Sequence, residues 1–119
     1  MLTSVHSTVK IEIYNMGLTS ETCFGITKYT ADRIICNSSS DKYEIMDSNF
    51  IDSLFCFMDS LEEENNVNPD IRTVMRIYDD SYLHETIYFN SEYIIRGDCI
   101  YIMRDEILSM LYDKLGNLD

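Results

Sequence analysis

The chain has no tryptophan, a single proline, four isolated glycines and only 9 lysine and arginine residues against 21 acidic ones. Glycines that stand singly cannot form a glycine-rich phosphate-binding loop. The shortage of positive charge leaves a formal net charge of -12, which repels nucleic-acid phosphates and anionic lipid headgroups. We therefore expect neither direct nucleic-acid binding nor binding to a membrane surface.

Long hydrophobic runs are also missing. No stretch approaches the roughly 20 apolar residues that a membrane-spanning helix needs. Residues 1–10 contain no apolar core of the kind found in signal peptides. The sequence therefore predicts a cytoplasmic protein, which would act in the host cytoplasm if its source is viral.

The cysteines show no metal-binding or redox spacing. They are separated by 12, 19 and 42 residues and include no CxxC pair: Cys23, Cys36, Cys56 and Cys99. Disulfides require an oxidising compartment, for which the sequence gives no other sign. We expect reduced thiols, most of them buried.

Catalytic and metal-binding patterns are equally sparse. The two histidines, His6 and His84, are not accompanied by a recognisable nucleophile motif. The acidic pair Asp79-Asp80 and the run 62–64 lack the spacing of a calcium loop. We therefore predict no enzymatic activity, no metal and no cofactor.

What is present is enough apolar material for one folded core. With 119 residues, 45% of them hydrophobic and 12% aromatic, residues 1–119 are expected to form a single domain. Alternating apolar residues predict strands over 8–14, 22–29, 33–36, 42–46, 72–78, 82–89, 92–96 and 99–103. Helical spacing predicts helices over 48–63 and 105–115, with Asp47 or Ser48 as the first N-cap and Gly116 as the second C-cap.

The two halves of the chain share this order of elements. Apolar residues of the first helix match those of the second at a constant offset of 57, and Ile13-Tyr14 matches Ile77-Tyr78 at 64. We interpret this as a tandem duplication, with internal repeats over about 8–64 and 72–118. The predicted fold class is α+β: two four-strand-plus-helix units, antiparallel sheet or sheets, and two amphipathic helices on one face.

Negative charge is concentrated in one segment. Residues 43–71 contain eight carboxylates and no lysine or arginine. On a continuous helix, Asp52, Asp59 and Glu63 fall on the side opposite the apolar residues, and Glu62 and Glu64 add charge at its end. The alternative is an ordinary solvated helix face, although unbalanced like charges one turn apart destabilise a helix.

Tyrosine is the second unusual feature, with nine in the chain. If the isoleucines of the second half face the helices, then Tyr78, Tyr88, Tyr93 and Tyr101 project from the opposite face of the sheet. Tyrosine favours partner-binding surfaces, but it is also a good strand former on half-exposed sheets.

These observations favour a non-enzymatic, acidic, cytoplasmic interaction protein. The leading hypothesis is an inhibitor that binds a basic or nucleic-acid-binding surface of a partner protein, for example a nuclease. A toxin immunity protein, or a viral or mobile-element protein that acts against a host defence such as a CRISPR effector, would fit. The alternatives are a homodimeric structural or assembly protein using the tyrosine-rich sheet face, and a small-molecule sensor or enzyme with its site between the repeats. The candidate partner-binding residues are Asp52, Asp59, Glu62, Glu63, Glu64, Tyr78, Tyr88 and Tyr101.

Overall fold

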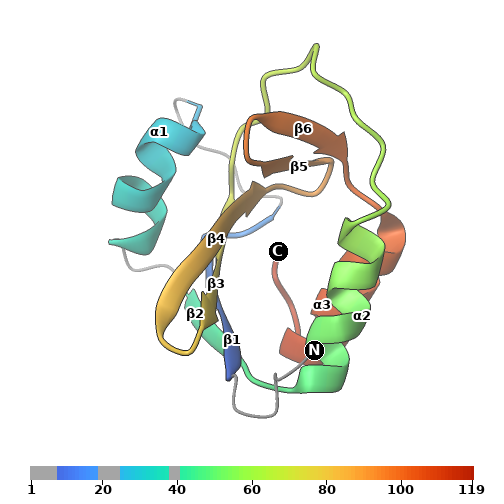
Figure 1. The fold of residues 1–119 in the computed structure, drawn as a ribbon. Helices are drawn as coiled ribbons and strands as arrows, with labels where there is room; N and C mark the ends of the chain where they lie inside the picture. The colour runs from blue at the N-terminus through green and yellow to red at the C-terminus, as the bar shows by residue number, and fades with distance from the viewer. Residues whose placement is uncertain (1–7, 19–24, 38–40) are drawn as a thin grey trace.

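A computed structural model describes residues 8–18, 25–37 and 41–119 and shows an α+β fold built on one antiparallel sheet (Figure 1). The sheet has six strands in the order β2-β1-β3-β4-β5-β6. The strands are β1 (Val9–Asn15), β2 (Asp41–Ile45), β3 (Thr73–Asp79), β4 (Tyr82–Phe89), β5 (Tyr93–Arg96) and β6 (Cys99–Ile102). The helices are α1 (Lys28–Ala31), which continues into the π-helical turn η2 (Asp32–Cys36), α2 (Ser48–Met58) and α3 (Asp105–Leu115).

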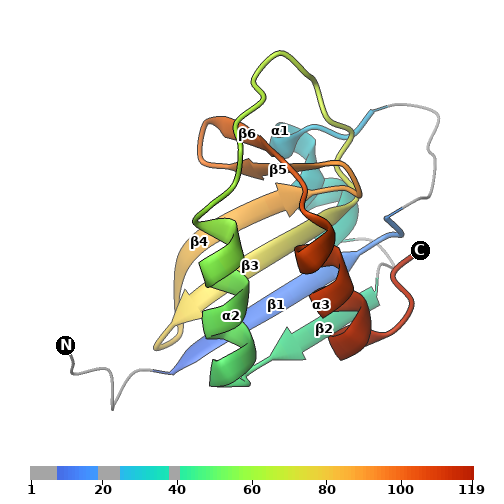
Figure 2. The same cartoon turned by 90° about the vertical axis from the view of Figure 1, so that its right-hand side faces the viewer.

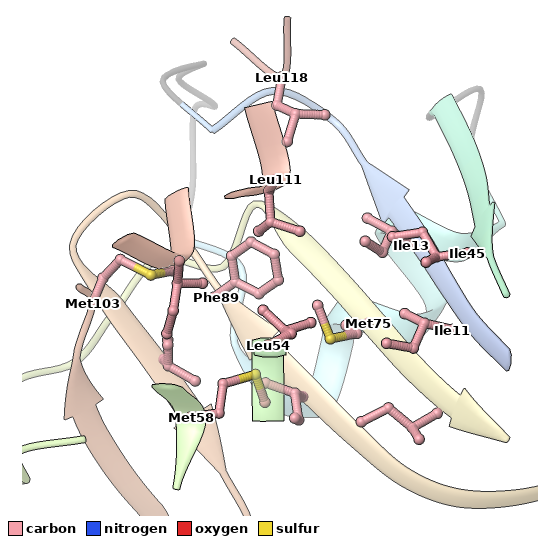
Figure 3. Close-up of a cluster of buried hydrophobic side chains, with 14 of the residues drawn as sticks. Ile11, Ile13, Ile45, Leu54, Met58, Met75, Phe89, Met103, Leu111 and Leu118 are labelled. Carbon is pink, nitrogen blue, oxygen red and sulfur yellow. The ribbon is translucent and has the colours of Figure 1, made fainter. Parts of the chain in front are cut away.

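Buried side chains form two clusters, one on each side of the sheet. The larger joins isoleucine and methionine side chains of β1 and β3 to Leu54 of α2 and Leu111 of α3 (Figure 3). The smaller joins Ala31 and Ile35, from the α1–η2 segment, to Val74 of β3. Figure 1 shows the α1–η2 segment on one side of the sheet, and Figure 2 shows α2 and α3 beside each other on the other side. The centre of the sheet is thus covered on both faces.

Helix α2 begins as the sequence predicts but ends earlier. The Asp47 carboxylate accepts hydrogen bonds from the backbone N–H groups of Asn49 and Phe50 at 3.1 and 3.4 Å, as an N-cap does. The helix ends at Met58 rather than near residue 63. Beyond it, the chain extends along β6, where the backbone N–H of Ile102 donates to the Glu62 carbonyl at 2.8 Å. Sheet hydrogen bonds therefore replace the last helical turn.

Helix α3 agrees with its prediction at both ends. It spans Asp105–Leu115, and two acidic residues in its first turn complement the helix dipole. Gly116 follows with a φ of 91°, and its backbone N–H donates to the Tyr112 carbonyl at 2.8 Å. Glycine adopts this left-handed conformation without the steric cost that other residues carry.

The strands predicted over 22–29 and 33–36 are wrong where the structure describes them. Residues 28–36 are helical, while residues 22–24 lie outside the described part of the chain. Ala31 and Ile35 are four positions apart, so a helix places both against the sheet, where each is fully buried. Burial on Val74 outweighs the local strand preference of adjacent isoleucines.

The two halves consequently contain different elements. Within the described residues, two strands precede α2 and four precede α3, so the predicted four-strand unit is wrong for the first half. The first strand and the last helix of each half nevertheless have equal lengths. Strands β1 and β3 are both seven residues long, and helices α2 and α3 are both eleven. A duplication at the level of sequence stays a prediction.

Burial differs among the leucines of the two segments predicted as helices, 48–63 and 105–115, which gives a test of packing. Leu54 and Leu111 are fully buried, whereas Leu61 and Leu115 are half-buried. We expect Leu111→Ala to lower the free energy of unfolding by about 2–5 kcal/mol, because it leaves a cavity between α3 and the sheet. Leu115→Ala, the matched control on the same helix, should cost clearly less. Urea unfolding followed by circular dichroism measures both, and equal losses would contradict the packing described here.

Candidate interaction surfaces

The predicted row of carboxylates on one helix face is not formed. Asp52 is exposed on α2 and has no ion pair among the described residues. Asp59 lies just past the helix end, and its carboxylate is 2.9 Å from Nη1 of Arg96. Glu63 lies in the extended segment beyond the helix. The prediction failed because it assumed that α2 continues to residue 63.

Arg96 of β5 instead gathers two carboxylates at the end of α2. Its Nε is 2.6 Å from Glu85 Oε2, and its Nη1 donates to Asp59 at 2.9 Å and to the Met58 carbonyl at 3.4 Å. The hydrogen bond to Glu85, together with that to Asp59, raises the pKa of Arg96 above its ordinary value despite partial burial. One cation therefore neutralises two acidic groups and also caps the helix C-terminus.

The run 62–64 is held by its backbone rather than by its side chains. The backbone N–H of Glu64 donates to the Ile100 carbonyl at 2.7 Å. This bond and the one from Ile102 to the Glu62 carbonyl join the run to β6. The Glu63 carboxylate accepts from Asn65 Nδ2 at 2.9 Å, and Glu62 is exposed. These three candidate residues lie together along the outer edge of β6, and we call them the edge segment.

The three candidate tyrosines do not share one sheet face. Tyr88 packs with the smaller cluster, beside η2, and its hydroxyl is 3.3 Å from Asp32 Oδ2. Tyr101 packs with the larger cluster, because it lies opposite Ile94 across the β5–β6 pair. Residues directly opposite in an antiparallel pair point to the same face. The prediction placed Tyr101 with Tyr78 and Tyr88, and the register of the hairpin shows that this was wrong.

The register also shows that Ile100, which was expected to face the helices α2 and α3, points to the opposite face of the sheet. It is opposite Ile95, and both belong to the smaller cluster. The tyrosine-rich face is moreover partly covered by α1 and η2. Tyr88 and Tyr101 therefore lie on opposite faces of the sheet, and a dimer formed through a tyrosine-rich face stays a prediction.

A charged cluster on this same face was not among the predicted site residues. Glu12 of β1 is only 8% exposed, and its carboxylate accepts the Tyr14 hydroxyl at 3.0 Å. Lys10 Nζ and Lys42 Nζ lie 3.2 and 3.6 Å from Glu12 Oε2. The sequence did contain a signal, because strand alternation places Lys10, Glu12 and Tyr14 on one side of β1. We call Lys10, Glu12, Tyr14 and Lys42 the Glu12 cluster.

The cluster keeps Glu12 ionised. Burial raises the pKa of Glu12, but hydrogen bonds from Tyr14 and Lys10, with the positive charge of Lys42, outweigh burial and leave the pKa below its ordinary value. In turn, Glu12 raises the pKa of both lysines. A cation–π contact extends the cluster, because the guanidinium carbon of Arg76 lies 5.1 Å from the centre of the Tyr14 ring.

A pocket of about 310 Å³ opens beside the cluster. Among the described residues, it is lined by Thr8, Lys10, Glu12, Met46, Tyr78 and Ser81. The ammonium and the carboxylate in this wall already pair with each other, so the charge that a small anion would need is engaged.

Thiols and metal-ligating groups are the other candidates for chemistry in the described ranges. No group of three His, Cys, Asp or Glu residues there could hold a metal ion. Cys56 is exposed, and Cys36 and Cys99 are half-buried, so the expectation of mostly buried thiols is wrong for these three. Cys23 lies outside the described residues. Burial raises the pKa of the Cys36 thiol, which lowers its reactivity.

Comparisons with known proteins provide no relative from which a site could be transferred. No family model matches the chain, and neither a curated protein nor a solved structure matches it. Among the described helices, none is long and apolar enough to cross a membrane.

The lowered pKa of Glu12 predicts a pH-dependent contribution to stability. An ionised Glu12 stabilises the fold above its unfolded pKa, near 4.5, and this contribution is lost as the pH falls through the lower folded value. Glu12→Gln should therefore lower the free energy of unfolding by about 1–3 kcal/mol at pH 7.

Urea unfolding at pH 7 and near pH 3 measures this difference, which should shrink at the lower pH. Glu92→Gln provides the control, because Glu92 is exposed and forms no ion pair in the part of the chain that is described. An equal loss for Glu12→Gln at both pH values would show that the carboxylate charge does not stabilise the cluster.

Proposed function

We propose that this chain is a non-enzymatic interaction protein that binds a basic surface of a partner protein. The proposed action is inhibition: the chain would occupy the surface with which a nuclease or another nucleic-acid-binding protein holds its phosphates. A toxin immunity protein and a viral or mobile-element inhibitor of a host defence both belong to this class. The proposal rests on how charge is distributed over the chain.

The observation that carries the proposal is that nearly all lysine and arginine side chains form ion pairs within the chain. All 9 lysine and arginine residues lie in the described part of the chain, and within it only Arg33 forms no ion pair. The remaining cations pair with nine of the 21 carboxylates. Glu21 lies outside the described residues, so eleven carboxylates remain without an ion pair there. The external field is therefore negative, and it favours cationic partners.

Several of these carboxylates lie on the side of the molecule that α2 and α3 cover. Asp52 of α2, with Asp105 and Asp113 of α3, is exposed and forms no ion pair with a described residue. We call these three the helix-side carboxylates. Glu62 and Glu63 of the edge segment add negative charge beyond the end of α2. We propose this surface in place of the single-helix row, because it does not depend on a longer α2.

Electrostatics would then govern both partner choice and the rate of encounter. Complementary charge raises association rates and suppresses binding to other acidic surfaces. Closely spaced carboxylates can also occupy positions that nucleic-acid phosphates would take on a basic groove. Such binding weakens with salt, because the screening length falls from more than 10 Å at low salt to about 3 Å at 1 M.

Charge reversal on this surface tests the proposal. The variant Asp52→Lys, Glu62→Lys and Asp113→Lys changes three exposed carboxylates without removing an ion pair among the described residues. We expect loss of partner binding, mainly through slower association, with unchanged thermal unfolding. The wild-type chain, immobilised at low salt in an extract of its source cell, should retain a basic protein that salt elutes and that duplex DNA displaces.

A matched variant separates the surface from net charge. Asp41→Lys, Asp79→Lys and Glu92→Lys produce the same change in formal charge on exposed residues elsewhere. This variant should retain most of the wild-type affinity. Equal binding by both variants would reject the proposed surface, and retention of no basic protein even at low salt would reject the proposed function.

A further inference from the structure

Within the described residues, the two outer edges of the sheet differ in whether another segment forms hydrogen bonds with them. At β6, the edge segment provides two backbone hydrogen bonds, of 2.7 and 2.8 Å, and Asn65 Oδ1 accepts from the Ile100 N–H at 2.9 Å. At the other edge, β2 has β1 as its only neighbouring strand within the described ranges. An uncovered edge presents backbone donors and acceptors to which another strand can add.

The side chains of β2 divide between the two faces in a way that is fixed by their contacts. Lys42 pairs with Glu12, and Glu44 pairs with Lys10, so both project to the face of the Glu12 cluster. Tyr43 and Ile45 pack with the larger hydrophobic cluster on the opposite face. Any strand that continues the sheet must match this division, because a shift of one residue exchanges the faces.

A second copy of β2 satisfies this requirement when the two strands run antiparallel about a two-fold axis normal to the sheet. Such an axis pairs each residue with one on the same face, so one residue must lie directly opposite its own copy, with the axis midway between the two. Centring it on Lys42 places two lysines opposite each other, and centring it on Glu44 does the same with two glutamates. Both arrangements are destabilised by like charges.

Only the register centred on Tyr43 pairs opposite charges, at two symmetric positions. Lys42 then lies opposite Glu44 of the second copy, and Glu44 lies opposite its Lys42. Tyr43 lies opposite Tyr43, an aromatic cross-strand pair, and all five residues of β2 take part. This is a local charge complementarity in a chain whose net charge of -12 otherwise opposes self-association.

We propose that β2 pairs with β2 of a second copy of this chain, in the antiparallel register centred on Tyr43. The two sheets would then form one continuous sheet, with α2 and α3 of both copies on the same side. This interface goes beyond the proposed function and does not depend on it, because it is formed by β2 and not by the helix-side carboxylates.

Two single charge reversals and their mixture test the register. In Lys42→Glu, glutamate faces glutamate at both positions, and in Glu44→Lys, lysine faces lysine. Each variant alone should dimerise at least about tenfold more weakly than wild type in sedimentation equilibrium. Mixed in equal amounts, the two variants should form a heterodimer, since each glutamate then faces a lysine of the other chain.

The mixture also provides the control for damage within one chain. Each reversal disturbs the ion pairs with Glu12 or Lys10, and mixing cannot repair that disturbance. The double variant Lys42→Glu with Glu44→Lys should recover a homodimer. A wild-type chain that stays monomeric over the full concentration series would overturn the proposal, as would single variants that dimerise like wild type or a mixture that fails to associate.

Discussion

The antiparallel pairing of β1 with β3 is the contact on which the rest of the fold depends. It joins seven residue pairs, from Val9 opposite Asp79 to Asn15 opposite Thr73, and links chain segments more than 55 positions apart. The end of this pair is closed by buried polar bonds: Thr73 Oγ1 donates to Asn15 Oδ1 at 2.8 Å, and Asn15 Nδ2 donates to the Leu118 carbonyl at 3.0 Å. The C-terminal residues that follow α3 are thereby attached to the centre of the sheet.

Charge is distributed around this centre according to burial. On the face of the Glu12 cluster, positive side chains surround a nearly buried carboxylate, which keeps that carboxylate ionised. At the end of α2, Arg96 performs a similar role for Glu85 and Asp59. Because these ion pairs engage basic side chains within the fold, few cations remain to balance the surface carboxylates, and the surface carries the net negative charge of the chain. Fold stability and the proposed partner chemistry are thus linked through the same small set of basic residues.

Local sequence was sufficient where an element carries its own signals. Helix α3 has acidic residues in its first turn and Gly116 after its last, so its bounds were predictable. It was insufficient where distant contacts decide. The residues 28–36 contain strand-forming isoleucines but become helical against Val74, and α2 stops early because β6 binds the following segment. Among the site residues, Tyr101 was misplaced because its face follows from hairpin register rather than from alternation alone.

The edge segment has a consequence for the order of folding on the ribosome. Residues 62–64 precede β6 by more than 30 positions, so the cover is synthesised before the strand that it covers. When β6 emerges, it can pair with β5 on one side and with the waiting segment on the other, and N-terminal regions generally fold first during synthesis. Unpaired strand edges are aggregation-prone in partly folded chains. The last strand of this sheet is therefore exposed to other nascent chains only briefly.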